Sequence, residues 1–319
     1  MAFATTLRPV LLAAARSPRI ERALTTLPVS KKVVRRFVAG SAEKDAIATS
    51  KTILDSGRFI TIDYLGEDTT EIAQATQTVT QYLSLLRAFG ALAQSTSQSP
   101  ARLEVSLKLS ALGQCLPQVG RSIALDNART ICAAAQQVGA WVTVDAEDHT
   151  TTDCTLSIVK ELRQDFPTLG TVLQAYLKRT EGDCRDLSGP GSRIRLCKGA
   201  YMEPESVAYQ ATEDVDASYS RCLGILMHGQ GYPMAATHDP AMIAVALQLA
   251  QDCGRGTEQF ELQMLFGIRD SEQRRLVAAG HNLRVYIPYG DQWYGYFMRR
   301  LAERPANLMF FVKSLTSSK

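Results

Sequence analysis

Ionisable and hydrogen-bonding side chains stand within or just after a series of short β-rich segments. They are Lys108, Asp145, Glu147, Asp148, Gln174, Tyr176, Lys178, Arg195, Lys198, Thr237, His238, Gln263 and Tyr286. Parallel strands that are buried on both faces usually read as continuous apolar runs, and an unpartnered charge inside one is costly. So many polar residues at equivalent positions therefore indicate one shared site.

Several chemistries fit these residues. Lys108 or Lys198 could form a Schiff base with a carbonyl substrate. Arg195 and Lys198 together could instead supply a fixed positive field for an anion or an electron-rich ring. Cys197 could be an activated thiolate beside Lys198, although an inert buried cysteine is the simpler interpretation. His238 has no second histidine nearby, so we expect no metal site.

A second polar cluster follows the last β-rich segment, in YGDQWYGYFMRRLAERP. If this stretch is helical from Gln292, one face carries Tyr296, Arg299, Arg300 and Glu303. Two adjacent arginines and a tyrosine suit a small carboxylate. The alternative is a solvated basic helix with an Arg299–Glu303 pair. The position directly after the eighth strand favours the carboxylate site.

Eight β-rich segments alternate with helical spacing from about residue 58, and they must position these residues. They are FITIDYLG, RLEVSLKLS, AWVTVDAED, TVLQAYLK, RIRLCKGA, PMAATHD, FELQMLFG and LRVYIP. This alternation predicts parallel strands with crossover helices, and eight such strands close an α/β barrel of the TIM-like (β/α)8 type. The rival is an open doubly wound sheet, but the first turn, DYLGEDTTE, has no GxGxxG motif. In a barrel, polar groups at strand C-termini share one active site.

Helical spacing and glycines mark the connections between these strands. One apolar helical face after the first strand carries Ile72, Ala75, Val79, Leu83, Leu86 and Phe89. Helix stops and turns are expected shortly before four of the later strands, at Gly139, Gly170, Gly231 and Gly280.

Composition limits the function classes. A length of 319 residues suits one barrel, and a net charge of +3 is too small to indicate nucleic-acid binding. No apolar run is long enough to span a membrane as a helix. The 7 cysteines are scattered without a CxxC pair, which disfavours disulfides and zinc and favours a cytoplasmic setting.

The N-terminus is basic. Glu21 is the one acid before residue 37, against Arg8, Arg16, Arg19, Arg22, Lys31, Lys32, Arg35 and Arg36. We interpret residues 1–57 as a basic helical arm that packs on a catalytic barrel of residues 58–319. A transit peptide is the alternative, and contact with a membrane surface is compatible with the arm.

These segments resemble the proline dehydrogenase family. The resemblance rests on LKLSALG at 107–113, VDAED at 144–148, LQAYLKR at 173–179, RLCKGAY at 195–201, ATHD at 236–239 and YIPYGDQWYGYFMRRLAER at 286–304. The segment DYLGE, which ends at Glu67, and the basic arm resemble short monofunctional bacterial members. The resemblance implies a distorted barrel and FAD as the cofactor.

The family resemblance also implies where FAD binds. It would lie across the C-terminal ends of strands four to six, against Ala146, Gln174, Arg195, Lys198, Gly199, Ala200, Thr237, His238 and Glu303. Arg195 would lie near the reactive ring nitrogen, where a cation raises the flavin's electron affinity. Hydride transfer from L-proline would give Δ1-pyrroline-5-carboxylate, and the electrons would pass to a membrane quinone from the inner face of the membrane.

The resemblance places the substrate as well. Arg299, Arg300 and Lys108 would hold the carboxylate of proline. The ring would pack between Tyr286, Tyr296 and Leu265. Asp145 would support the site electrostatically, and Glu67 would act as a gate that pairs with Arg299 over bound proline.

Four positions depart from the family's usual residues, and two other activities stay open. The departures are Cys197, Met202, Asp239 and Leu262. A hydroxyproline dehydrogenase is one alternative, although Tyr286 would crowd a 4-hydroxyl group. A Schiff-base lyase is the other. We expect the chain to be too short for the aldehyde dehydrogenase module of fused relatives, so a separate pyrroline-5-carboxylate dehydrogenase would consume the product.

Overall fold

Eight parallel strands close into one barrel in the order of the chain. The computed structural model describes residues 34–96 and 102–303. The strands are β1 (Phe59–Tyr64), β2 (Leu103–Leu107), β3 (Trp141–Val144), β4 (Gly170–Gln174), β5 (Arg193–Cys197), β6 (Tyr232–Ala236), β7 (Glu261–Leu265) and β8 (Leu283–Tyr289). The barrel closes where β1 pairs with β8, from Phe59 opposite Arg284 to Tyr64 opposite Tyr289. The predicted (β/α)8 barrel is confirmed.

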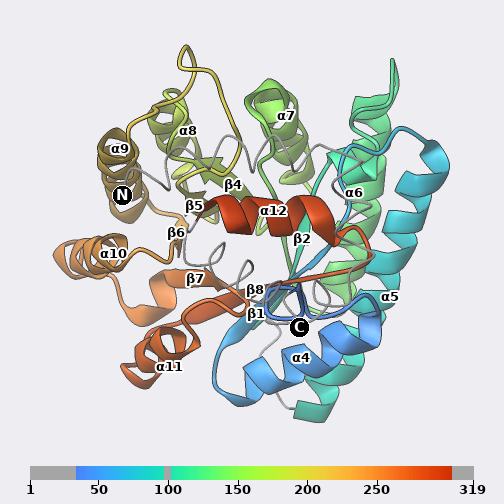
Figure 1. Ribbon diagram of the computed structural model, residues 1–319, viewed down its shortest axis with the longest axis horizontal. Coiled ribbons are helices and arrows are strands. Elements are labelled where there is room, and N and C mark those ends of the chain that lie inside the picture. Colours follow the sequence, from blue (N-terminus) through green and yellow to red (C-terminus); the bar gives the residue numbers. More distant parts are fainter. Residues whose placement is uncertain (1–33, 97–101, 304–319) are drawn as a thin grey trace, which may run out of the picture.

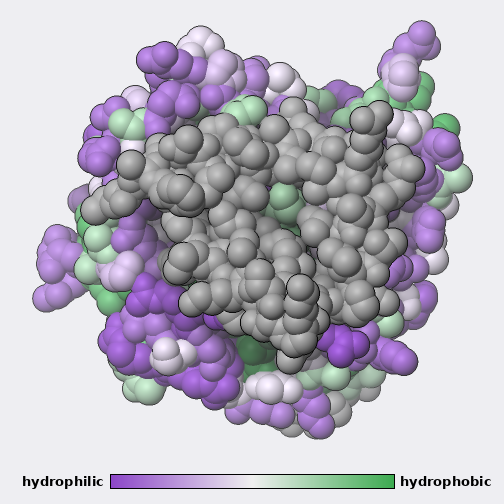
Figure 2. Space-filling view, in the orientation of Figure 1, coloured by the Kyte–Doolittle hydropathy of each residue, from purple (hydrophilic) through white to green (hydrophobic). Residues whose placement is uncertain are grey.

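Helices surround this barrel as an outer ring (Figure 1). They are α5 (Ile72–Thr96), α6 (Gly120–Gln137), α7 (Thr152–Leu162), α8 (Thr180–Leu187), α9 (Thr212–His228), α10 (Pro240–Asp252) and α11 (Asp270–Ala278), with short 3-10 turns η2 (Ser110–Leu112), η3 (His149–Thr151) and η4 (Thr257–Gln259). The predicted apolar face of α5 is buried at Val79 and Phe89, but Ile72 at its first turn is exposed. Hydrophilic residues gather over α11 on the outer surface (Figure 2).

Two helices make the barrel irregular. α4 (Glu43–Asp55) occupies the place in the outer ring between α11 and α5, packing on β1 and β8. Its buried residues Ala46, Ile53 and Leu54 belong to the same apolar core as the strands. The helix after β8, α12 (Trp293–Glu303), therefore leaves the ring and lies across its centre (Figure 1). The N-terminal part of the predicted arm, residues 1–33, lies outside the described residues, and the division at residue 57 stays a prediction.

The predicted helix stops and turns are right at Gly139, Gly231 and Gly280, and Gly231 lies between the end of α9 and the start of β6. The prediction is wrong at Gly170. Gly139 and Gly280 adopt φ of 72° and 88°, a left-handed conformation that favours glycine. Gly170 is instead the first residue of β4. A Cβ atom there would lie 2.5 Å from Thr143 Oγ1, so close approach of β3 to β4 requires glycine.

The barrel interior is filled by paired charges. Side chains alternate between the two faces of a strand, so Glu104, Arg193, Arg195 and Arg284 point inward, and each is 4% exposed or less. Glu104 accepts hydrogen bonds from Arg193 and Arg195, while Glu261 pairs with Arg284 at 2.7 Å. Within the described part of the chain, no helix is long and apolar enough to cross a membrane.

We predict that Glu104→Gln destabilises the fold strongly, because it leaves the charges of Arg193 and Arg195 poorly compensated inside the barrel. Breaking a buried ion pair costs about 3–5 kcal/mol. The free energy of unfolding in denaturant measures this loss. The control is Glu161→Gln, which removes an exposed pair with Arg121 and should cost about 1 kcal/mol or less. Equal losses in the two variants would contradict the prediction.

Candidate active site

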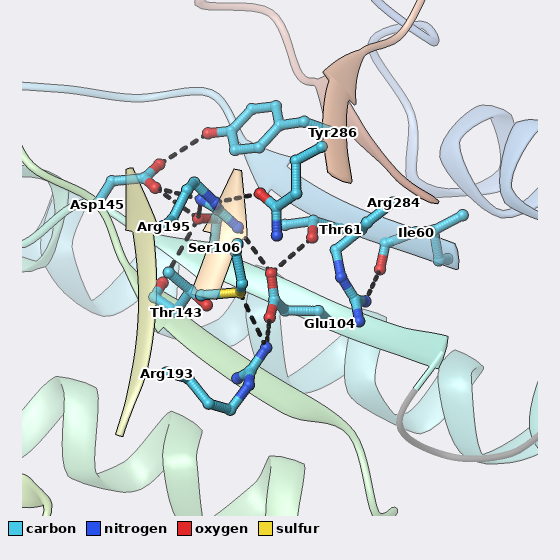
Figure 3. A network of polar contacts seen from close by, with 12 residues as sticks. Ile60, Thr61, Glu104, Ser106, Thr143, Asp145, Arg193, Arg195, Arg284 and Tyr286 are labelled. Atoms are coloured by element: carbon cyan, nitrogen blue, oxygen red, sulfur yellow. Dashed lines mark hydrogen bonds and ion pairs between the residues drawn. The ribbon is translucent and has the colours of Figure 1, made fainter. Parts of the chain in front are cut away.

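Arg195 lies at the centre of the polar network in Figure 3. It projects from β5 and is 4% exposed. Its Nε atom donates to Gln263 Oε1 at 2.5 Å and its Nη2 atom to Glu104 Oε1 at 2.7 Å. Its Nη1 atom donates to Ser106 Oγ at 2.9 Å and Asp145 Oδ1 at 2.8 Å. These contacts from β2, β7 and the end of β3 fix the position of the guanidinium. Another rotamer of Arg195 would lose these hydrogen bonds.

Asp145 joins this network to the barrel mouth. Its Oδ1 atom also accepts from Ser106 Oγ at 2.7 Å, and its Oδ2 atom accepts from the Tyr286 hydroxyl at 2.7 Å. The Tyr286 ring centre lies 5.4 Å from the Arg195 guanidinium carbon. Burial and the Asp145 carboxylate raise the pKa of Tyr286 well above its usual value. Tyr286 is therefore a neutral, fixed wall of the site.

Lys108 is held by two carboxylates. Its Nζ atom lies 2.7 Å from Asp63 Oδ2 and 3.7 Å from Asp145 Oδ2. Burial alone would lower the pKa of Lys108, but these carboxylates outweigh burial and raise it above the usual value. The amine is therefore charged. A Schiff-base nucleophile must be neutral when it attacks, so this environment is wrong for a lyase.

The predicted helix over the mouth begins at Trp293 and places its arginines in the site. Arg299 is 12% exposed at its side chain and pairs with Glu67, with Nη1 and Oε2 2.9 Å apart. Its guanidinium carbon also lies 5.4 Å from the Tyr201 ring centre. The Arg300 guanidinium carbon lies 5.1 Å from the Tyr296 ring centre. A half-buried Arg299 that is paired with Glu67 disfavours a solvated basic helix. The Glu303 side chain lies outside the described residues.

A third group of predicted residues lies at the ends of β4, β5 and β6 or directly after them. Gln174 donates through Nε2 to the Glu147 carbonyl oxygen at 2.8 Å. Lys198 pairs with Asp239 at 2.7 Å and with Asp216. His238 accepts the Leu265 backbone N–H at its Nε2 atom, at 2.9 Å, so its ring proton is on Nδ1. The hydroxyl of Thr237 accepts the Asp239 N–H at 3.1 Å.

Gly199 lets the backbone after β5 pass close to the Tyr176 ring. Its φ is 115°, and a Cβ atom would lie 2.3 Å from the Tyr176 ring. Residues 197–200 are half-buried, as are Ala146, Leu265 and Tyr286. The strand ends therefore present a face of small and polar groups, on which a flat ligand could rest.

Other polar residues at the strand ends serve the fold. Asp148 caps η3 by accepting the Thr150 N–H at 3.0 Å. Lys178 donates to the Glu205 carbonyl oxygen at 2.7 Å, and Tyr176 donates to the Glu203 carboxylate at 3.3 Å. Cys197 is half-buried, with Sγ 3.7 Å from the Leu173 carbonyl oxygen. In residues 34–96 and 102–303, no group of three or more His, Cys, Asp or Glu side chains could hold a metal ion.

The residues beneath the site were not predicted from the sequence. They are Asp63, Glu104, Ser106, Arg193, Glu261 and Arg284, all 3% exposed or less. Polar residues at every second position were the available signal. Glu104 and Ser106 share one face of β2, Lys108 directly follows that strand, and Arg193 and Arg195 share one face of β5. Only the polar residues nearest the strand ends were predicted to form the site.

Comparisons with known proteins agree on one family. The family model described as proline dehydrogenase matches residues 46–313. Proline dehydrogenase 1 of Bacillus subtilis is 39% identical over 281 residues, covering 88% of this chain and 90% of the relative. Proline dehydrogenase of Deinococcus radiodurans is 37% identical over 312 residues, covering 97% of each.

A solved structure supports the fold alone. Proline utilization A from Bdellovibrio bacteriovorus, inactivated by N-propargylglycine, matches with a TM-score of 0.78 at 24% identity. The match covers 85% of this chain and 32% of that longer chain.

We predict a pH-dependent contribution to stability from Glu147. Burial raises the pKa of this carboxyl from 4.5 to about 7, so the folded chain keeps a proton that the unfolded chain loses. The resulting stabilisation is complete below pH 4.5 and is lost as pH rises through 7. Between pH 4.5 and 8, the free energy of unfolding of Glu147→Gln should therefore rise relative to that of the wild type by up to about 3 kcal/mol. Denaturant titrations of both proteins at both pH values measure this gain. The same change with pH in the free energy of unfolding of the wild type and the variant would contradict the prediction.

Proposed function

The chain belongs to the proline dehydrogenase family, and from this premise we propose that it oxidises L-proline to Δ1-pyrroline-5-carboxylate with FAD. The observation that carries this proposal is the placement of three cations at one barrel mouth. Arg195 is fixed below it, Lys108 at its side and Arg299 above it on α12. This arrangement supports a role for Arg195 beneath a flavin and for Lys108 and Arg299 in binding a small carboxylate.

The strand ends fit a flavin in their chemistry. Gln174, Lys198, Thr237 and His238 supply polar groups, while Ala146, Gly199 and Ala200 leave room for a ring system. The glycine at 199 is required by the fold itself, since a Cβ atom there would meet Tyr176. When bound, FAD would supply the hydride acceptor. Glu303, the last member of the expected set, has a side chain outside the described residues.

Arg195 would act on the flavin through its charge. Burial lowers the pKa of a guanidinium, but Glu104 and Asp145 reverse this effect and raise the pKa of Arg195. The side chain is therefore charged at every working pH. Since four hydrogen bonds already hold it, it is preorganised and needs no rearrangement as negative charge develops above it.

Proline would bind between the barrel and α12. Arg299 and Arg300 would take its carboxylate with help from Lys108, and each charge-assisted contact contributes about 1.5–3 kcal/mol. Tyr286, Tyr296 and Leu265 would enclose the ring. The amine must be neutral when the adjacent carbon loses hydride, so turnover should rise with pH. The Glu67–Arg299 pair supports the proposal that Glu67 closes the site.

The two rival activities fit this site less well. Tyr286 is held by Asp145 and lies beside Arg195, so its ring cannot easily move away from a 4-hydroxyl group on proline. Lys108 is charged, and Lys198 lies between Asp216 and Asp239, which disfavours a Schiff-base lyase. We further propose that electrons pass to a membrane quinone at the inner face of the membrane, and that a separate pyrroline-5-carboxylate dehydrogenase consumes the product in the cytoplasm.

We predict that the purified protein is yellow and that L-proline bleaches its flavin absorbance in the absence of oxygen. Visible spectra before and after addition of substrate measure this directly. Trans-4-hydroxyproline is the matched comparison and should bleach the flavin more slowly, because Tyr286 crowds its hydroxyl group. A colourless protein that borohydride traps onto a carbonyl substrate would point to the lyase instead.

A further inference from the structure

A chain of hydrogen bonds joins Ser110 to the segment that carries Glu67. This segment, Glu67–Thr69, lies between β1 and α5. Ser110, the first residue of η2, accepts the Asp68 N–H at its Oγ atom, at 3.1 Å. Its carbonyl oxygen accepts the Thr69 N–H, also at 3.1 Å. Two successive backbone groups of the segment are therefore bound to one residue.

Ser110 is itself oriented by Glu147, a buried acid that the proposed reaction does not use. Glu147 is 7% exposed and Ser110 is 1% exposed. The Ser110 N–H donates to Glu147 Oε1 at 3.0 Å, and the Ser110 hydroxyl donates to Oε2. A serine hydroxyl has one proton and two lone pairs. Because the Ser110 hydroxyl donates its hydrogen bond to Glu147, Ser110 Oγ can only accept the hydrogen bond from the Asp68 N–H.

The bound segment is conformationally demanding. Asp68 has a φ of 53°, in the left-handed region that most residues avoid, at a cost of about 1 kcal/mol or more. The adjacent residue, Glu67, makes the ion pair with Arg299. The contact of the Asp68 N–H with Ser110 Oγ therefore helps to hold this conformation next to the residue that faces α12.

We propose that Glu147, acting through Ser110, is a positioning residue that holds Glu67 opposite Arg299. It does not touch the reacting atoms. The same residue accepts the Gln174 amide at its backbone carbonyl, so it connects the gate segment to the face expected to hold the flavin. The kinetic part of this inference rests on the proposed function, whereas the anchoring of residues 67–69 does not.

The test compares Ser110→Ala with Glu67→Ala and the double variant. Loss of one hydrogen bond in this chain should raise KM for proline about 5- to 10-fold, with kcat within about 2-fold. The double variant should be no worse than Glu67→Ala alone, because both changes remove the same interaction. Ser122→Ala is the control, since the exposed Ser122 hydroxyl donates to the carbonyl oxygen of Val119 at the start of α6, and its KM should not change.

Amide hydrogen exchange gives a readout that needs no turnover. In Ser110→Ala, the amides of residues 67–69 should exchange about 5-fold faster or more than in the wild type, and Glu147→Gln should shift them in the same direction. Unchanged exchange at these amides would overturn the anchor whatever the activity. If exchange is faster but the KM effects of Ser110→Ala and Glu67→Ala add up in the double variant, the role of Ser110 in positioning Glu67 is overturned. A protein that does not oxidise proline yet shows the faster exchange would refute the proposed function and keep the anchor.

Discussion

The rest of the site depends on the charge pairing around Arg195 inside the barrel. Glu104 and Asp145 accept hydrogen bonds from the two Nη atoms of the Arg195 guanidinium. These contacts keep the buried cation ionised and fix its orientation. The network continues through Ser106 and Tyr286 to the mouth, as Figure 3 shows. An apolar barrel interior would be easier to fold, because burying ions carries a large desolvation cost. We infer that the chain keeps these charges because they orient the groups above them.

A second constraint concerns the outer ring. α4 fills the position beside β1 and β8, so α12 is released to lie across the mouth (Figure 1). Arg299 then meets Glu67 from the β1–α5 connection and Tyr201 from the segment after β5. The upper wall of the site is thus built from segments that are far apart in the chain, and only the closed barrel brings them together.

Much of this arrangement could be predicted from the sequence. Strand positions follow from apolar and β-branched runs, and the mouth follows from polar residues at their ends. The Glu67–Arg299 contact spans 232 residues, and only the family resemblance suggested it. The role of α4 in the ring could not be predicted, because its amphipathic pattern does not say which strands it covers. Once a barrel was assumed, Glu104 and Glu261 could have been found from the alternation of side chains along β2 and β7, which places both on the inward face.

The midpoint potential of bound flavin in Arg195→Gln tests the central claim most directly. If the fixed charge of Arg195 favours the reduced flavin, its removal should lower the two-electron potential by about 30 mV or more, since 30 mV corresponds to about 1.4 kcal/mol. The exposed variant Arg121→Gln, in which α6 loses a pair with Glu161, should leave the potential unchanged. An unaltered potential in Arg195→Gln with flavin still bound would contradict the account.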